Sequence, residues 1–360
     1  MEKNALQQRR LAVVREFRAR KVDCFLVTGL PNVRYLSGFT GSNALLLLWE
    51  GGELLFTDPR YGIQAAQESD CRLRVARGGL MEEALKSVRR RKFRRVGFES
   101  RRLLYADYET LRGGLRLGAQ PVPVSGWVEE RRMVKSPDEI EAIRAAVRLN
   151  SSAFEAALRR YRAGVREVEL AAEIDHQMRR LGAESPAFDT IVASGARAAL
   201  PHAKPTQAPI EPGTVLLIDM GARVNGYVSD MTRTLFAGGA PKKLLAHYRA
   251  VLDAQLAGLA AVREGATARQ VDAACRRELR KHGLADLFVH STGHGLGLEI
   301  HEAPRLAKQT ALALRAGMVV TIEPGIYKEG FCGIRIEDTV VVTQNGCEIL
   351  TPTSKEPMAV

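Results

Sequence analysis

The carboxyl-terminal part of the sequence contains an internal repeat. Residues 164–182 (GVREVELAAEIDHQMRRLG) and residues 265–283 (GATARQVDAACRRELRKHG) have the same length and the same glycine at each end. Each follows a longer segment with helical spacing and precedes a matching strand-like phrase, GTVLLID at 213–219 and GMVVTIE at 317–323. A repeated set of two helices and a hairpin predicts two halves, related by a pseudo-twofold axis, that face each other across a central site.

The hairpin of the first half has a clear turn signal. Residues 215–235 read VLLIDMGARVNGYVSDMTRTL, with strand-forming runs on both sides of Asn225-Gly226. This dipeptide best accommodates the positive φ angles at both central positions of a type I′ turn. A two-residue turn there predicts that Val224 pairs with Tyr227, and this pairing sets the register of the whole hairpin.

In that register two aspartates lie on one face. Asp219 falls opposite Thr232, and Asp230 becomes the diagonal neighbour of Asp219, about 7–8 Å away at Cα. Glu323 and Glu337 occupy the matching places in the second half. Buried carboxylates this close together are costly unless protons or cations neutralise them. The apolar strands around them favour a metal site over a solvated face that carries acids by chance.

Residues 290–302, HSTGHGLGLEIHE, supply imidazoles on a glycine-rich segment. A set of two Asp, one His and two Glu suits a pair of divalent cations about 3.5–4 Å apart. Oxygen ligands with a single imidazole suit Mn²⁺ most naturally, and Co²⁺ or Zn²⁺ can replace it. Such a pair activates water, polarises a carbonyl group and neutralises a tetrahedral oxyanion.

Four phrases, IDMGARVNGYVSDMTRT, HSTGHGLGLEIHE, TIEPGIY and GIRIEDT, resemble the signatures of the pita-bread metallopeptidases. That family includes Xaa-Pro aminopeptidase, Xaa-Pro dipeptidase (prolidase) and methionine aminopeptidase. The resemblance runs from Arg132 onward. The earlier stretch YLSGFTGSNALLLLWEGGELLFTDPRY resembles the creatinase-like domain of the Xaa-Pro branch. The resemblance implies an α/β (α+β) fold, with a creatinase-like domain at 1–128 and a pseudo-twofold pita-bread catalytic domain at 129–360.

The resemblance also implies the roles of the metal ligands. Asp219 would chelate one metal ion, and Asp230 and Glu337 would bridge both ions. His294 and Glu323 would hold the second ion, and Glu323 is also counted with the catalytic residues. All five ligand positions of the family are filled in this sequence.

Four further residues are assigned to catalysis or substrate binding through the resemblance. His290 would contact the proline side or the scissile peptide group, and His301 would hydrogen-bond the tetrahedral intermediate. His202 matches a substrate-side histidine. Arg335 resembles a site arginine of some Xaa-Pro members.

The implied activity is dinuclear, metal-dependent hydrolysis of the Xaa-Pro bond at the amino terminus of peptides, by a homodimer. Xaa-Pro dipeptidase is the alternative, because the loops that limit substrate length cannot be read from the sequence. Creatine amidinohydrolase resembles this architecture but works without metal. A catalytically inert binding protein of the same fold is a more remote alternative. Both are disfavoured because such relatives lack the full ligand set.

Composition limits the remaining possibilities. Lys and Arg number 53 against 41 Asp and Glu, a formal net charge of +12, and the densest basic run is RRRKFRR at 89–95. This run follows a predicted helix, so it indicates a solvated helix end rather than a specific nucleic-acid site. The five cysteines show no CxxC pair or metal spacing, which predicts reduced thiols in the cytoplasm. The apolar run at 44–49 is too short to span a membrane, and no secretory signal is recognisable, so a soluble protein is expected.

The amino-terminal part alternates strand-like and helix-like segments. Strands are expected at 24–27 and in a hairpin over 43–57, and the stretch Pro121-Val122-Pro123 is expected to close this domain. A new helix is then predicted from the S-x-x-E capping box of Ser136, with Pro137 at its first position, to about Tyr161.

Overall fold

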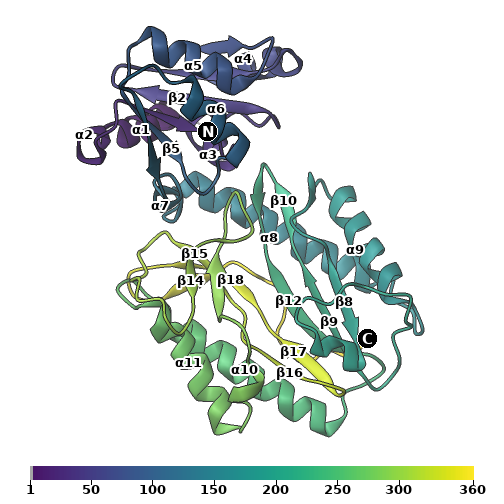
Figure 1. The fold of residues 1–360 in the computed structure, drawn as a ribbon. Helices are drawn as coiled ribbons and strands as arrows, with labels where there is room; N and C mark the ends of the chain where they lie inside the picture. The colour runs from purple at the N-terminus through teal and green to yellow at the C-terminus, as the bar shows by residue number, and fades with distance from the viewer. Residues whose placement is uncertain (1–2) are drawn as a thin grey trace. The chain divides into compact units, whose positions relative to one another are not determined.

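The computed structural model describes residues 3–360 and divides into two compact units, with the division between Arg132 and Met133 (Figure 1). Among these residues no helix is both long and apolar enough to cross a membrane. The elements of the first unit are α1 (Lys3–Val14), α2 (Phe17–Arg20), β1 (Cys24–Val27), α3 (Leu30–Ser37), β2 (Ala44–Trp49), β3 (Gly52–Thr57), α4 (Gly62–Glu68), β4 (Leu73–Val75), α5 (Leu80–Arg90), β5 (Arg95–Glu99), α6 (Tyr105–Gly114), β6 (Gln120–Val124) and α7 (Glu129–Arg132).

The first unit is built on a six-stranded sheet in the order β4-β3-β2-β1-β5-β6. The predicted strand at 24–27 and the predicted hairpin are confirmed as β1, β2 and β3. The stretch that contains Pro121 and Pro123 was expected to close the domain, but it forms the edge strand β6, parallel to β5. Proline is tolerated there because an edge strand leaves one row of backbone donors unused.

The chain leaves the first unit slightly later than the predicted boundary at 128/129. Helix α7 packs within this unit, because Arg131 Nη2 donates to the Ala12 carbonyl at 2.9 Å and Arg132 Nη1 donates to Asn32 Oδ1 at 2.6 Å. Side-chain contacts of this kind cannot be read from local sequence. The basic run at 89–95 ends α5 as expected, with Arg89 and Arg90 exposed.

The second unit contains the repeated halves. Its elements are α8 (Pro137–Leu158), α9 (Glu167–Arg180), β7 (Ser185–Pro186), β8 (Ile191–Ser194), β9 (Val215–Met220), β10 (Ala222–Val224), β11 (Tyr227–Val228), β12 (Met231–Phe236), α10 (Lys242–Ala261), α11 (Ala268–Lys281), β13 (Gly293–Gly295), β14 (Glu302–Leu306), β15 (Val319–Ile322), β16 (Gly325–Lys328), β17 (Cys332–Arg335), β18 (Asp338–Val342) and β19 (Cys347–Ile349). Helices α9 and α11 have the same length, 14 residues, and each follows a long helix, α8 or α10. The repeat therefore corresponds to repeated structure.

The local predictions for this unit are confirmed. Ser136 caps α8 through a complete capping box with Glu139. Asn225 and Gly226 have φ angles of 48° and 74°, as a type I′ turn requires. Val224 pairs with Tyr227, and Asp219 lies opposite Thr232. The register that places the acids is therefore the one the turn dictates.

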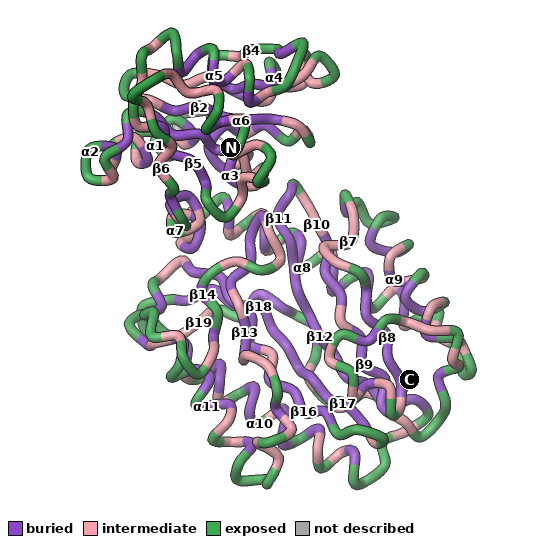
Figure 2. The backbone as a smooth tube through the Cα atoms, in the orientation of Figure 1, coloured by how far each residue is buried: buried purple, intermediate pink, exposed green. Residues whose placement is uncertain are grey.

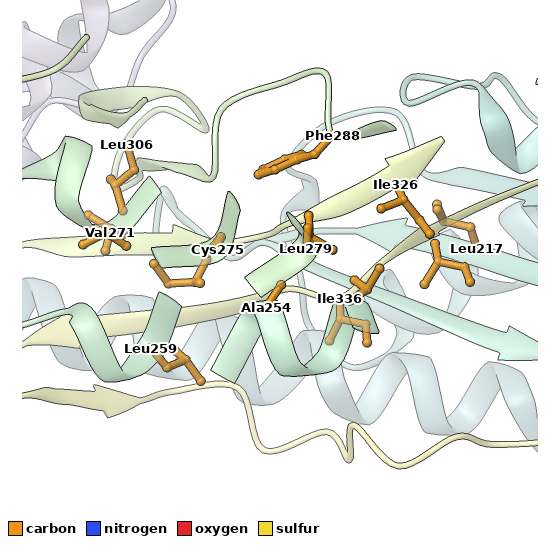
Figure 3. Packing of buried hydrophobic residues seen from close by; sticks show 14 of the residues in the cluster. Leu217, Ala254, Leu259, Val271, Cys275, Leu279, Phe288, Leu306, Ile326 and Ile336 are labelled. Carbon is orange, nitrogen blue, oxygen red and sulfur yellow. The ribbon is translucent and has the colours of Figure 1, made fainter. Parts of the chain in front are cut away.

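The central strands of the second unit, β8, β9, β12, β15 and β18, are buried, whereas the outer faces of its helices are exposed (Figure 2). Side chains of α10 and α11, among them Ala254, Val271 and Leu279, pack with strand residues such as Leu217 and Ile326 in one cluster (Figure 3). This apolar layer forms a rigid support for the polar site, because closely packed side chains resist displacement.

Candidate metal centre

All nine residues assigned to the site from the sequence line one cavity of about 640 Å³ in the second unit. They are Asp219, Asp230, His294, Glu323 and Glu337, with His202, His290, His301 and Arg335. The cavity also contains apolar residues, including Phe188, Ile191 and Ile300. A cavity that combines a cluster of polar side chains with apolar lining residues is typical of a small-molecule or peptide site.

Three carboxylates form the centre of this cavity. Asp219 belongs to β9, and Asp230 and Glu337 directly precede β12 and β18. One oxygen atom from each lies within 4.8 Å of the other two. The two hairpins of the repeat thus bring acids separated by more than a hundred residues into metal-binding distance.

His294 and Glu323 lie beside this cluster. Nε2 of His294 is 3.5 Å from Asp230 Oδ2 and 3.4 Å from Glu323 Oε1. The other ring nitrogen, Nδ1, lies 3.0 Å from the Gly295 carbonyl, to which an Nδ1–H would donate. This bond leaves a lone pair on Nε2 that points towards the carboxylates, as in histidines that ligate metals.

The backbone beside His294 needs a glycine. A Cβ atom at Gly293 would lie 1.9 Å from the Thr321 carbonyl oxygen of β15. Only glycine allows β13 to approach β15 this closely, and the approach brings His294 to the acids. The glycine-rich sequence around His294 thus has a packing reason.

The electrostatics of the cluster indicate missing positive charge. Burial and the neighbouring carboxylates raise the pKa of Asp230 and of Glu337 well above the usual range. Burial is also the main reason that the pKa of Glu323 rises to about 7. Asp219 Oδ1 and Glu337 Oε1 are buried without a hydrogen-bond partner. Buried oxygens without donors and acids this close together fit divalent cations, which would supply both the charge and the missing contacts.

Arg335 and Thr232 orient two of these carboxylates. Arg335 Nη2 donates to Asp219 Oδ2 at 2.6 Å, and its Nε donates to Thr232 Oγ1 at 3.0 Å. The Thr232 hydroxyl in turn donates to Glu337 Oε2 at 2.7 Å. Each of these two acids therefore has one oxygen that is hydrogen-bonded within the protein. The other oxygen, Oδ1 of Asp219 or Oε1 of Glu337, has no hydrogen-bond partner and could bind a metal ion.

His290 is held in a separate network. Its Nδ1 lies 2.8 Å from the Ser291 carbonyl, and its Nε2 lies 2.8 Å from Tyr327 Oη. Tyr327 Oη also accepts a hydrogen bond of 2.7 Å from Arg335 Nη1, so the tyrosine hydroxyl proton is directed to His290. Burial and the positive charge of Arg335 lower the pKa of His290 to about 4, which keeps the ring neutral near pH 7.

The two remaining histidines are exposed to the cavity. The ring of His301 lies 4.4 Å from that of His294 in an edge-to-face arrangement. Burial and the proximity of His294 lower the pKa of His301. His202 also lines the cavity, with its neighbours Pro201 and Lys204. Both imidazoles are therefore available to a bound molecule.

The sequence reasoning missed several residues of the site. Tyr327 is the last residue of the phrase TIEPGIY, but nothing in its spacing indicated a contact with His290. Arg305 pairs directly with His294 across β13 and β14, and Asp189 lies at the cavity wall. The glutamate after His301, Glu302, forms a buried ion pair with Lys135 at 3.1 Å. No local signal identified these residues, because each reaches the site through strand pairing or long-range packing.

Comparison with known proteins gives two family matches that together span most of the chain. A model described as metallopeptidase family M24 matches residues 141–344. A model described as the creatinase/prolidase N-terminal domain matches residues 9–134.

Individual relatives resemble the chain over nearly its full length. A Xaa-Pro dipeptidase from Pyrococcus furiosus is 35% identical over 98% of this chain and 99% of its own. The structure of a Xaa-Pro dipeptidase from Bacillus anthracis superposes with a TM-score of 0.95 at 38% identity, over 99% of this chain and all of that one. An X-Pro aminopeptidase from Thermotoga maritima gives a TM-score of 0.90 at 37% identity, over 96% of this chain and all of that one.

Proposed function

Because this chain belongs to metallopeptidase family M24, with a creatinase/prolidase domain before the catalytic domain, we propose that it hydrolyses Xaa-Pro bonds at the amino termini of peptides. The predicted fold class, a creatinase-like domain followed by a pita-bread domain, is confirmed by the same matches and by the structural neighbours. The observation that carries the proposal is the convergence of the five predicted metal-ligand side chains and three further histidines in one cavity.

The metal centre would hold two divalent ions. Asp219 would chelate one, His294 and Glu323 the other, and Asp230 and Glu337 would bridge them. We propose Mn²⁺, because four of the five ligands are carboxylates, with Co²⁺ or Zn²⁺ as substitutes. When bound, such ions supply Lewis acidity, which stabilises negative charge on a substrate carbonyl and lowers the pKa of water.

The histidines would position the substrate. Both ring nitrogens of His290 are already engaged by Ser291 and Tyr327, so His290 would offer its neutral ring face to the proline ring. His301 has a ring that is exposed in the cavity and would donate a hydrogen bond to the oxyanion that develops at the scissile carbonyl. His202, which is also exposed and lines the same cavity, would be a further contact for the substrate.

These contacts suit a proline substrate in particular. The nitrogen before proline carries no N–H, so a site that relies on that donor handles the bond poorly. Here the side chains described above would approach the carbonyl group and the pyrrolidine ring, and none of them would require an N–H from the scissile bond. This chemistry favours Xaa-Pro substrates over Met-Ala peptides.

The main proposal is an aminopeptidase that accepts peptides longer than two residues. A dipeptidase is the second candidate, and one observation favours it. Arg305 lies opposite His294 across β13 and β14, is exposed to the cavity and forms no ion pair among residues 3–360. A cation there suits the free carboxylate of a dipeptide that ends in proline.

Three further properties belong to the same proposal. The five cysteines are all free thiols, which suits the reducing cytoplasm. Among residues 3–132 no side chain lines the candidate metal cavity, and we propose that the first unit forms a homodimer, as the family resemblance implies. The net charge of +12 would favour anionic molecules in general without a specific nucleic-acid partner.

One set of assays tests the proposal. Purified protein loaded with Mn²⁺ is incubated with Ala-Pro, Ala-Pro-Ala and Met-Ala-Ser. Release of Ala from Ala-Pro-Ala is expected for the aminopeptidase, and cleavage of Ala-Pro alone would identify a dipeptidase. Rapid release of Met with both proline peptides intact would overturn the assignment to Xaa-Pro substrates.

A further inference from the structure

We propose that a second groove, beside the catalytic cavity, binds the part of a substrate that follows proline and favours acidic side chains there. The groove has a volume of about 520 Å³. The inference rests on the proposed function, because it assumes that a peptide longer than two residues occupies the catalytic cavity.

The groove adjoins the catalytic cavity. His290, Ser291 and Arg305 line both of them. His290 would contact the proline ring, so the chain that follows proline would leave the cavity past these shared residues. The groove then continues along the segment after β14, where Ala307 and Lys308 line it.

The groove carries an excess of unpaired positive charge. Arg305 and Lys308 are exposed, and neither forms an ion pair within residues 3–360. Arg276 also lines the groove, but its guanidinium is occupied by Asp272 and by the backbone carbonyls of the 288–290 segment. Among the described lining residues the one carboxylate is Asp286. Two available cations against one acid favour an anionic occupant.

The spacing of the two cations indicates which substrate residue each meets. Arg305 lies beside His294, next to the reacting bond, and Lys308 lies three residues further along the chain. Lys308 lies in the turn at 307–310 that follows β14, where the Thr310 N–H donates to the Ala307 carbonyl. Arg305 lines both cavities whereas Lys308 lines only the groove, so Lys308 would meet a substrate residue further from the reacting bond. We place it at the second residue after proline, which is the fourth residue of the peptide.

Three peptide amides test this inference, Ala-Pro-Ala-Glu-NH₂, Ala-Pro-Ala-Gln-NH₂ and Ala-Pro-Ala-Lys-NH₂. The amide removes the terminal carboxylate, so the fourth side chain alone differs in charge. The wild-type protein with Mn²⁺ should cleave the Glu peptide with a kcat/KM about two- to five-fold above that of the Gln peptide, the effect of one exposed ion pair. The Lys peptide should be the poorest, and added salt should reduce the differences.

Charge variants make the test specific. Lys308→Gln should abolish most of the preference, and Lys308→Glu should invert it in favour of the Lys peptide. Both changes are at an exposed position, so folding is not at risk. Lys242→Gln is the matched control, because Lys242 is an exposed lysine that lines neither cavity and should leave the preference unchanged.

The outcomes separate the two proposals. Equal kcat/KM values for the Glu and Lys peptides in the wild type would overturn the proposed acidic preference of the groove. An unchanged preference in Lys308→Glu would overturn it as well. Cleavage of Ala-Pro without cleavage of any tetrapeptide would also overturn it, while leaving Xaa-Pro hydrolysis intact. Failure to cleave Ala-Pro, Ala-Pro-Ala and all three tetrapeptides would instead reject the proposed function.

Discussion

Replacement of Arg233 by methionine should destabilise the second unit strongly and loosen the metal centre. The Arg233 side chain is 2% exposed and donates to the Asp338 carboxylate at 2.9 Å. It also donates to the backbone carbonyls of Glu337, Thr353 and Ser354. The guanidinium thus joins β12, β18 and the carboxyl-terminal segment, immediately beside a predicted metal ligand.

The size of the effect follows from what remains after the substitution. Removal of one partner of a buried ion pair costs about 3–5 kcal/mol, because the other charge stays buried. Asp338 keeps two partners on Oδ2, Lys355 at 2.6 Å and Gln255 at 2.9 Å, so the lower part of that range applies. The free energy of unfolding should fall by about 3 kcal/mol. The Glu337 carbonyl also loses its hydrogen bond from Arg233. Metal affinity should therefore fall by about 10- to 100-fold, as it does when other residues that hydrogen-bond to metal ligands are replaced.

Arg144→Met provides the matched control. Arg144 pairs with Glu141 and Glu348, whose side chains are 66% and 49% exposed. Loss of such surface pairs costs less than about 1 kcal/mol. Arg233 differs from Arg144 in the burial of its carboxylate partner and in its hydrogen bonds to backbone carbonyls, so the comparison measures the loss of a buried polar network rather than of an arginine alone.

The assay is urea unfolding of the metal-free proteins, followed by circular dichroism. Both tryptophans, Trp49 and Trp127, lie in the first unit, so their fluorescence reports separately on that unit. Calorimetric titration with Mn²⁺ gives the affinity. A loss of stability in Arg233→Met no larger than that in Arg144→Met would refute the reasoning, as would an unchanged Mn²⁺ affinity.

Four further predictions concern the metal centre and its surroundings. Removal of metal with a chelator should abolish hydrolysis, and added Mn²⁺ should restore it. Full activity in protein that metal analysis shows to be metal-free would contradict this metal dependence. Asp230→Ala and Glu337→Ala should each lose both ions, since each residue would bridge them, and metal analysis that still finds two bound ions would count against bridging. The pKa values of Asp230, Glu337 and Glu323 are raised, so the folded, metal-free protein holds protons that the unfolded chain releases. Its Tm should therefore fall as the pH rises, and for Glu323 the fall is expected between pH 4.5 and about 7. Bound Mn²⁺ should remove this trend, and a Tm of the chelated protein that rises over the same range would contradict the prediction. Tyr327→Phe should lower kcat/KM for Ala-Pro-Ala about ten-fold, because His290 loses a hydrogen bond worth roughly 1.4 kcal/mol, and unchanged kinetics would show that His290 needs no such support.

Local chemistry determined much of this protein from its sequence. The positive φ angles that Asn225-Gly226 accommodates set the hairpin register, and that register alone places Asp219 opposite Thr232. The capping box at Ser136 and the matched glycine-bounded helices are likewise short-range signals. Because strand side chains alternate with a period of two, a correct turn fixes which acids share a face.

Contacts between distant segments were decided only by the tertiary structure. Arg335 reaches Asp219 across 116 residues, and Tyr327 reaches His290 across 37. Arg305 enters the site through its pairing with His294, and the proline stretch before α7 became an edge strand through its pairing with β5. Such partners depend on which surfaces pack together, and packing depends on the whole chain rather than on local spacing. The sequence could therefore name the five candidate metal ligands that converge in the cavity. The side chains that orient them and the groove beside them depend on how the strands pair, which local spacing does not reveal.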